Sequence, residues 1–219
     1  MRIIDKYTTA EHWRAARQRA ARYMGVPLGE RLTAFMETAD RMLRGGMPLE
    51  EAASILATFH DLSRFEEGGA AEEFWEGIFS TARKLTQRRN RLGRLRSLWG
   101  VTPIASISYG ARADRQLGLA SDSLVFNTYY ITSNFDVNLS RLEAFIIKDH
   151  YGLSYTFRRY VLAWSLLNYD IFHLYNDRGL LEPAGGYGSD RFGINLTEMQ
   201  AYAKAGKFLF TYAYGADYR

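Results

Sequence analysis

The feature that most constrains the fold of this chain is the alternation of short β-rich runs with helical segments after residue 100. β-Branched and aromatic residues predict strands at 102–108, 123–132, 169–175 and 208–212. Helical patterns lie between them at 111–117, 138–167 and 196–205, and a break is expected near 151–152. Strands joined by helices form right-handed β-α-β units, so this part predicts an α/β fold: a Rossmann-like parallel β-sheet with helices on both faces.

The first hundred residues have a different composition and predict helices. Apolar residues recur at helical intervals in four segments, which begin near residues 8, 32, 48 and 70, and glycines end the first three. Thirteen of the 15 tyrosines come after position 100. We therefore expect a helical N-terminal region at 1–100, followed by a Rossmann-like α/β unit at 101–219.

Composition and motifs exclude several classes of protein. The chain has no cysteine, which excludes disulfide scaffolds and thiolate metal sites. The four histidines are too scattered for a metal motif, and neither the dinucleotide-binding nor the phosphate-loop glycine pattern is present, so no cofactor is expected. No apolar stretch is long enough for a membrane helix, and charges stand where a signal peptide would be apolar, so a cytoplasmic protein is expected.

Polar and glycine residues follow all four predicted strands. Ligands of open parallel sheets bind beyond the carboxyl ends of the strands, so these positions are the candidate site. The segments are 109–112, 133–136, 176–179 and 214–219, and the glycine-rich segment 182–193 is a further candidate loop. Structural roles remain open as alternatives: tight turns for Gly110 and Gly215, a helix cap for Asp136, and a solvated charge for Asp217.

Residues 101–219 resemble the N-terminal half of GT-B glycosyltransferases, particularly the retaining, glycogen-synthase-like group. Three elements carry the resemblance: an Asp-hydrophobic-hydrophobic-His strand at Asp170 to His173, the Lys-x-x-Lys helix end at Lys204 to Lys207, and the segment Tyr214 to Arg219. Tyr214 stands where that family usually has a histidine. The resemblance implies sugar transfer from a nucleotide-sugar donor to a glycan or lipid-linked acceptor. It also implies a second, nucleotide-sugar-binding domain, which residues 1–219 do not include, so the chain alone is not expected to turn over substrate.

The resemblance also implies roles for particular residues. Negative charge develops on the departing phosphate in sugar transfer, so an arginine at a strand end is expected to face it, with Arg112, Arg178 and Arg219 as candidates. Gly110 would let a loop approach the donor, and Asn176 and Asp217 would bind sugar hydroxyls or orient the loop. The full set of expected substrate-binding residues is Tyr109, Gly110, Arg112, Asn176, Asp177, Arg178, Tyr214, Gly215, Asp217 and Arg219.

A basic segment provides the alternative function. Seven of the fourteen residues at 83–96 are basic, and no acidic residue occurs from 77 to 113. These residues are Arg83, Lys84, Arg88, Arg89, Arg91, Arg94 and Arg96. Such a segment fits a non-catalytic module that binds anionic lipid, nucleic acid or a protein partner. With lipid as the partner, the chain would lie at the inner face of the membrane. The remaining alternative is a basic helix face that is simply solvated. No nucleic-acid-binding motif is present.

Overall fold

The computed structural model describes residues 10–63, 69–128, 134–175, 179–181 and 196–212. Within these residues the N-terminal part is helical, as the sequence predicts. Its helices are α1 (Ala10–Met24), α2 (Leu28–Leu43), α3 (Leu49–Phe59) and α4 (Gly69–Arg91).

The remainder alternates strands and helices. In chain order its elements are β1 (Arg96–Val101), α5 (Ala105–Gln116), β2 (Ala120–Val125), β3 (Val137–Asn138), α6 (Ser140–Asp149), a 3-10 turn (Tyr151–Leu153), α7 (Ser154–Asn168), β4 (Ile171–Tyr175), α8 (Leu196–Lys204) and β5 (Phe208–Tyr212). The five strands form one sheet in the order β3-β2-β1-β4-β5, and every pair is parallel. The predicted α/β class with a Rossmann-like parallel sheet is therefore confirmed.

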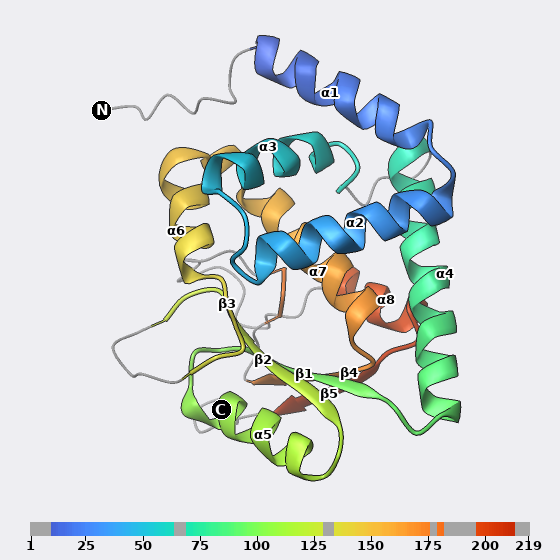
Figure 1. The fold of residues 1–219 in the computed structure, drawn as a ribbon, viewed down its shortest axis with the longest axis vertical. Helices are drawn as coiled ribbons and strands as arrows, with labels where there is room; N and C mark the ends of the chain where they lie inside the picture. The colour runs from blue at the N-terminus through green and yellow to red at the C-terminus, as the bar shows by residue number, and fades with distance from the viewer. Residues whose placement is uncertain (1–9, 64–68, 129–133, 176–178, 182–195, 213–219) are drawn as a thin grey trace.

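The elements are arranged in layers around the sheet (Figure 1). Helix α5 packs on one face, against β1 and β2, while α7 lies on the opposite side of the sheet with α4 and α8 near it. Helices α1, α2 and α3 form a further layer beyond α7. Helix α7 is thus covered on both sides, and 12 of its 15 residues are buried.

A single hydrophobic cluster includes side chains from both predicted units. Phe35 of α2, Phe59 of α3 and Phe74 of α4 pack around Tyr160 and its neighbours in α7, and the same cluster continues to Leu98 in β1. The change in composition near residue 100 therefore does not coincide with a break in this core.

A buried ionic network joins α4 to the amino ends of three strands. The carboxylate of Asp170, which precedes β4, accepts hydrogen bonds from the Arg96 amide (2.9 Å) and the Thr86 hydroxyl (2.7 Å). It also pairs with Arg89 (3.2 Å) and lies 3.7 Å from the Lys207 ammonium. The aspartate of the Asp-hydrophobic-hydrophobic-His motif therefore lies at the amino edge of the sheet, where it connects structural elements.

Two predicted strands are displaced, and both for local reasons. The strand expected at 102–108 is wrong: the strand runs over Arg96–Val101, and residues from Ala105 onward are helical. Gly93, with a φ of +62°, ends α4, and β1 begins three residues later. Pro103, which cannot donate a backbone hydrogen bond within a sheet, lies just beyond the end of β1. The strand expected at 123–132 begins earlier and covers Ala120–Val125. The strands near 169–175 and at 208–212 are confirmed.

Candidate functional site

The carboxyl edge of the sheet is the candidate functional site. The strand order places β1 beside β4, and the chain continues from β1 to β2 on one side and from β4 to β5 on the other. In open parallel sheets, ligands bind beyond the carboxyl ends of the strands at this kind of reversal. Helix α5 begins at this edge, and Ile104 at its N-cap supplies no side-chain hydrogen bond to the first turn. The Thr102 hydroxyl donates a hydrogen bond to the Tyr175 carbonyl (3.1 Å) and so connects the ends of β1 and β4.

The first group of predicted site residues does not lie at this edge. Tyr109, Gly110 and Arg112 belong to the middle of α5, because β1 is earlier in the chain than expected. Tyr109 is 63% exposed, and the Arg112 guanidinium lies 5.9 Å from its ring centroid on the solvent side. The prediction that these three follow the first strand is therefore wrong.

Gly110 has a packing role that neither sequence interpretation proposed. A Cβ atom on Gly110 would lie 2.6 Å from the ring of Trp99 in β1. The absence of a side chain lets α5 lie directly on this ring. The same ring stacks on the imidazole of His173, with 3.9 Å between centroids.

The other predicted substrate-binding residues lie outside the described residues. These are Asn176, Asp177, Arg178, Tyr214, Gly215, Asp217 and Arg219. The first three follow β4 in the chain and the others follow β5, and these strands pair in parallel with Tyr175 opposite Tyr212. The two segments therefore begin at the same edge of the sheet.

An aromatic surface leads to this edge on the side of the sheet that carries α5. It comprises Trp99, His173, Tyr175, Phe210 and Tyr212, which we call the aromatic face. The Tyr175 and Tyr212 rings stack at 4.8 Å, and the Tyr212 hydroxyl lies 2.8 Å from His173 Nδ1. Burial lowers the pKa of His173 and outweighs the opposite effect of Asp114, so the imidazole is neutral near pH 7. Phe210 is 50% exposed, so part of this face is open to ligands.

Sequence reasoning missed a group of buried charges beside the same edge. Arg158 of α7 pairs with Glu143 of α6, and its guanidinium lies 3.4 Å from the ring centroid of Phe126, which directly follows β2. Glu198 of α8 is fully buried and accepts hydrogen bonds from the amides of Leu180 (2.8 Å) and Leu181 (2.9 Å).

Glu198 therefore fixes the segment that returns from β4. Its carboxylate also accepts a hydrogen bond from a side chain, the Tyr202 hydroxyl, at 2.8 Å. Burial raises the pKa of Glu198, although the hydrogen bonds and Arg158 act in the opposite direction. The one sequence signal for this role was the position of Glu198 in the first turn of a predicted helix, where an acidic residue is favourable.

Asp136 connects β2 to the start of β3 and does not cap a helix. Its carboxylate accepts hydrogen bonds from the amide and hydroxyl of Ser123, each at 2.8 Å, and from Arg115 at 3.1 Å. Burial opposes its ionisation, but these donors more than offset burial and lower the pKa of Asp136.

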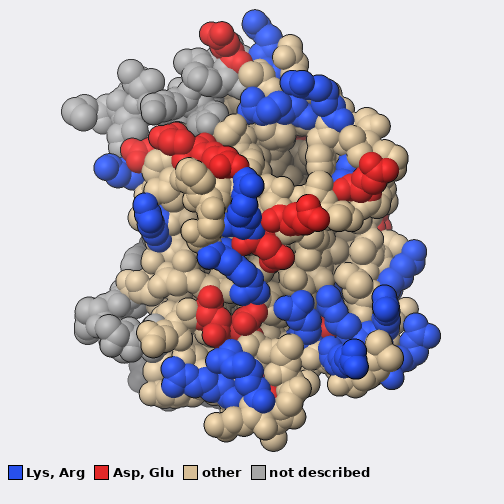
Figure 2. All heavy atoms as spheres, in the orientation of Figure 1, with Lys and Arg blue, Asp and Glu red and all other residues tan. Residues whose placement is uncertain are grey.

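The basic segment is divided between structural and exposed residues. Arg83 donates to the Lys204 carbonyl, Arg89 pairs with Asp170, and the Arg96 guanidinium lies 5.4 Å from the Tyr169 ring centroid. Among the described residues, Lys84, Arg88, Arg91 and Arg94 are exposed and form no such contact. Figure 2 shows basic side chains gathered over the lower part of α4.

The fold and the carboxyl edge define the class of this protein as Rossmann-like α/β. No family of proteins, no curated protein and no solved structure matches the chain in our comparisons. In the described part of the chain, no group of histidine and acidic side chains is arranged to hold a metal ion. None of the helices there has the length and hydropathy that a membrane span requires.

Proposed function

We propose that this chain is the acceptor-side half of a GT-B-type glycosyltransferase, which transfers a sugar from a nucleotide-sugar donor to a glycan or lipid-linked acceptor. The observation that carries the proposal is the parallel pairing of β4 and β5. It starts the two polar segments after Tyr175 and Tyr212 at one edge of the sheet, beside the first turn of α5. Free amides at a helix start suit the phosphate that departs during sugar transfer.

The aromatic face supports a carbohydrate as the acceptor. Flat aromatic rings offer apolar surface to the apolar face of a sugar ring, while a phenolic hydroxyl can bond to a sugar hydroxyl. Tyr175 and Tyr212 combine both properties at the carboxyl edge, and each is half-buried and therefore held in position.

Glycan binding tests the proposal directly. The ¹⁵N-labelled chain is titrated with a panel of neutral oligosaccharides, and amide shifts are mapped along the chain. We expect shifts at the ends of β4 and β5, and a loss of affinity of about tenfold in Tyr212→Ala, equal to about 1.4 kcal/mol. Phe208→Ala is the matched control, since Phe208 lies on the same strand but pairs with Ile171 at the opposite end.

The same titration shows whether the chain binds the acceptor or the nucleotide-sugar donor. Shifts that appear with oligosaccharides but not with nucleotide-sugars support an acceptor-binding half. A chain that binds no oligosaccharide, or one whose binding is equally weakened by Phe208→Ala, contradicts the proposal.

The exposed cations of residues 84–94, at the end of α4 and just after it, favour contact with an anionic membrane, where lipid-linked acceptors reside. Lys84, Arg88, Arg91 and Arg94 lie close in sequence, and Leu92 among them is 57% exposed. We expect the chain to float with vesicles containing anionic lipid at low salt and to be released at high salt.

A variant that lacks three of these positive charges tests which residues make this membrane contact. Replacing Arg88, Arg91 and Arg94 by Gln is expected to abolish flotation. Replacing Arg14, Arg17 and Arg22 of α1 removes equal charge elsewhere and is the control. If the two variants float equally, the cations of residues 84–94 are not the membrane contact.

A further inference from the structure

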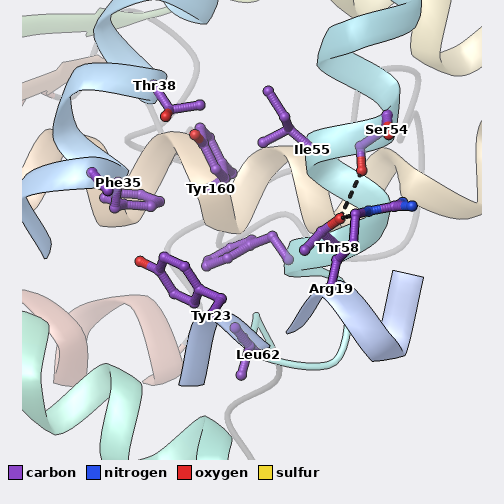
Figure 3. A pocket seen from close by; sticks show the side chains of 11 residues that line it. Arg19, Tyr23, Phe35, Thr38, Ser54, Ile55, Thr58, Leu62 and Tyr160 are labelled. Carbon is purple, nitrogen blue, oxygen red and sulfur yellow. Dashed lines mark hydrogen bonds between the residues drawn. The ribbon is translucent and has the colours of Figure 1, made fainter. Parts of the chain in front are cut away.

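A pocket in the helical layer is separate from the carboxyl edge of the sheet. It has a volume of about 360 Å³ and lies among α1, α2, α3 and α7 (Figure 3). Small-molecule sites have volumes of about 300 to 1,000 Å³ and apolar walls with few polar groups.

The floor of the pocket is aromatic. Phe35, Phe59 and Tyr160 are all at least 95% buried. The ring centroids of Phe35 and Tyr160 are 4.8 Å apart, and those of Phe59 and Tyr160 are 5.1 Å apart with the rings perpendicular. These rings form a surface against which another aromatic ring can pack edge-to-face or in an offset stack.

The floor contains one unsatisfied polar atom. The Tyr160 side chain is 1% exposed, and its hydroxyl has no hydrogen-bond partner among the described residues. Figure 3 shows this hydroxyl directed toward Thr38 at one side of the pocket. A buried hydroxyl without a partner is destabilising, and a ligand group that accepts its hydrogen bond would remove this cost. Burial raises the pKa of Tyr160, which keeps the hydroxyl protonated and able to donate.

The mouth of the pocket is polar and positively charged. The Arg19 Nε donates to the Thr58 hydroxyl (2.8 Å), which itself donates to the Ser54 carbonyl (3.0 Å). Among the residues that the structure describes, no carboxylate pairs with Arg19. Helix α1 carries four arginines and one glutamate in 15 residues, and basic side chains gather at this end of the molecule in Figure 2.

We propose that this pocket binds a small aromatic carboxylic acid that carries a hydroxyl group on the far side of its ring. The ring packs among Phe35, Phe59 and Tyr160, the hydroxyl accepts the hydrogen bond of Tyr160, and the carboxylate binds Arg19 at the mouth. Arginine suits a carboxylate because its planar guanidinium donates several hydrogen bonds in a fixed geometry. This site is independent of the proposed sugar transfer.

Three probes separate the contributions of the two polar ends. The protein is titrated calorimetrically with 4-hydroxyphenylacetate, with phenylacetate and with methyl 4-hydroxyphenylacetate. We expect the hydroxylated acid to bind about tenfold more tightly than either other probe, because each of them lacks one charged or hydrogen-bonding group.

Variants assign each contribution to its residue. Tyr160→Phe is expected to bind the two acids equally, and Arg19→Gln to bind the hydroxylated acid and its ester equally. Arg14→Gln is the matched control on α1, since Arg14 does not line the pocket. Ala34→Phe fills the mouth from an exposed position and is expected to abolish binding of all three probes without unfolding the protein.

The proposal is overturned if wild-type protein binds none of the probes at millimolar concentration. It is equally overturned if the preference for the hydroxylated acid persists in Tyr160→Phe, or if Ala34→Phe, shown to be folded by circular dichroism, binds as wild type does.

Discussion

At the amino edge of the sheet, Lys207 is buried beside Asp170, and burial alters its charge. Both side chains are 0% exposed, yet their nearest charged atoms are 3.7 Å apart, and Arg89 also pairs with Asp170. Burial lowers the pKa of Lys207 to about 7, although Asp170 acts in the opposite direction. The ammonium is thus held in a network that already contains another cation.

This pKa predicts a specific dependence of stability on pH. Between about pH 7 and pH 10 the unfolded chain keeps the Lys207 proton and the folded chain releases it, so the free energy of unfolding rises with pH. Below pH 7 both states are protonated and the contribution is constant. Relative to Lys207→Met, wild-type protein is expected to gain about 2 kcal/mol between pH 7 and pH 9.

Urea unfolding of both proteins at the two pH values measures this difference. The comparison with Lys207→Met cancels the other titrating groups. Parallel pH profiles for the two proteins would show that Lys207 is ionised in the folded state throughout this range.

Among the secondary-structure elements, α5 illustrates how packing outweighs helix propensity. Gly110 lies in the interior of this helix, where alanine is intrinsically better by about 1 kcal/mol. A methyl group there would meet the Trp99 ring at 2.6 Å, and Trp99 is itself held by a hydrogen bond from its Nε1 to Asp114 (2.7 Å). The ring cannot move aside without breaking that bond and the stack on His173.

Gly110→Ala is therefore expected to destabilise the protein by about 1–3 kcal/mol. Gly29→Ala in α2 is the control, because a Cβ at Gly29 has nothing within 4 Å. That change is expected to be neutral or to stabilise by up to about 1 kcal/mol. Chemical denaturation of the two variants measures both effects, and a stabilised Gly110→Ala protein would contradict the proposed contact between α5 and β1.

For the molecule as a whole, α7 determines whether the helical region and the sheet unfold together. Phe35 of α2 and Phe59 of α3 pack on Tyr160 of this helix, and Trp164 donates a hydrogen bond to Asp40 of α2 (2.7 Å). Without the N-terminal helices, these side chains of α7 would be exposed to water.

We accordingly expect one cooperative unfolding transition, with the same midpoint by far-ultraviolet circular dichroism and by tryptophan fluorescence. A fragment comprising residues 93–219 is expected to lack dispersed amide signals in its NMR spectrum. A fragment that folds alone, or two separated transitions in the full chain, would indicate two independent units.

The sequence by itself determined the elements whose pattern is local. The alternation of strands and helices after residue 100 predicted the parallel α/β sheet, and the run from Phe208 to Tyr212 predicted β5 with its observed bounds. The first strand was predicted too late in the chain because β1 follows the basic helix closely, and only the turn at Gly93 separates them. That shift moved Tyr109, Gly110 and Arg112 from a strand end into a helix.

The tertiary structure alone decided which distant residues meet. Glu198 contacts the amides of Leu180 and Leu181, Arg158 pairs with Glu143, and Tyr160 forms the floor of a pocket with residues from α2 and α3. Secondary-structure patterns arise from interactions between neighbours in the chain, which a sequence displays directly. Buried charges and cavities depend on which helix and strand faces pack together. The sequence pattern of one segment does not identify the segment that packs against it.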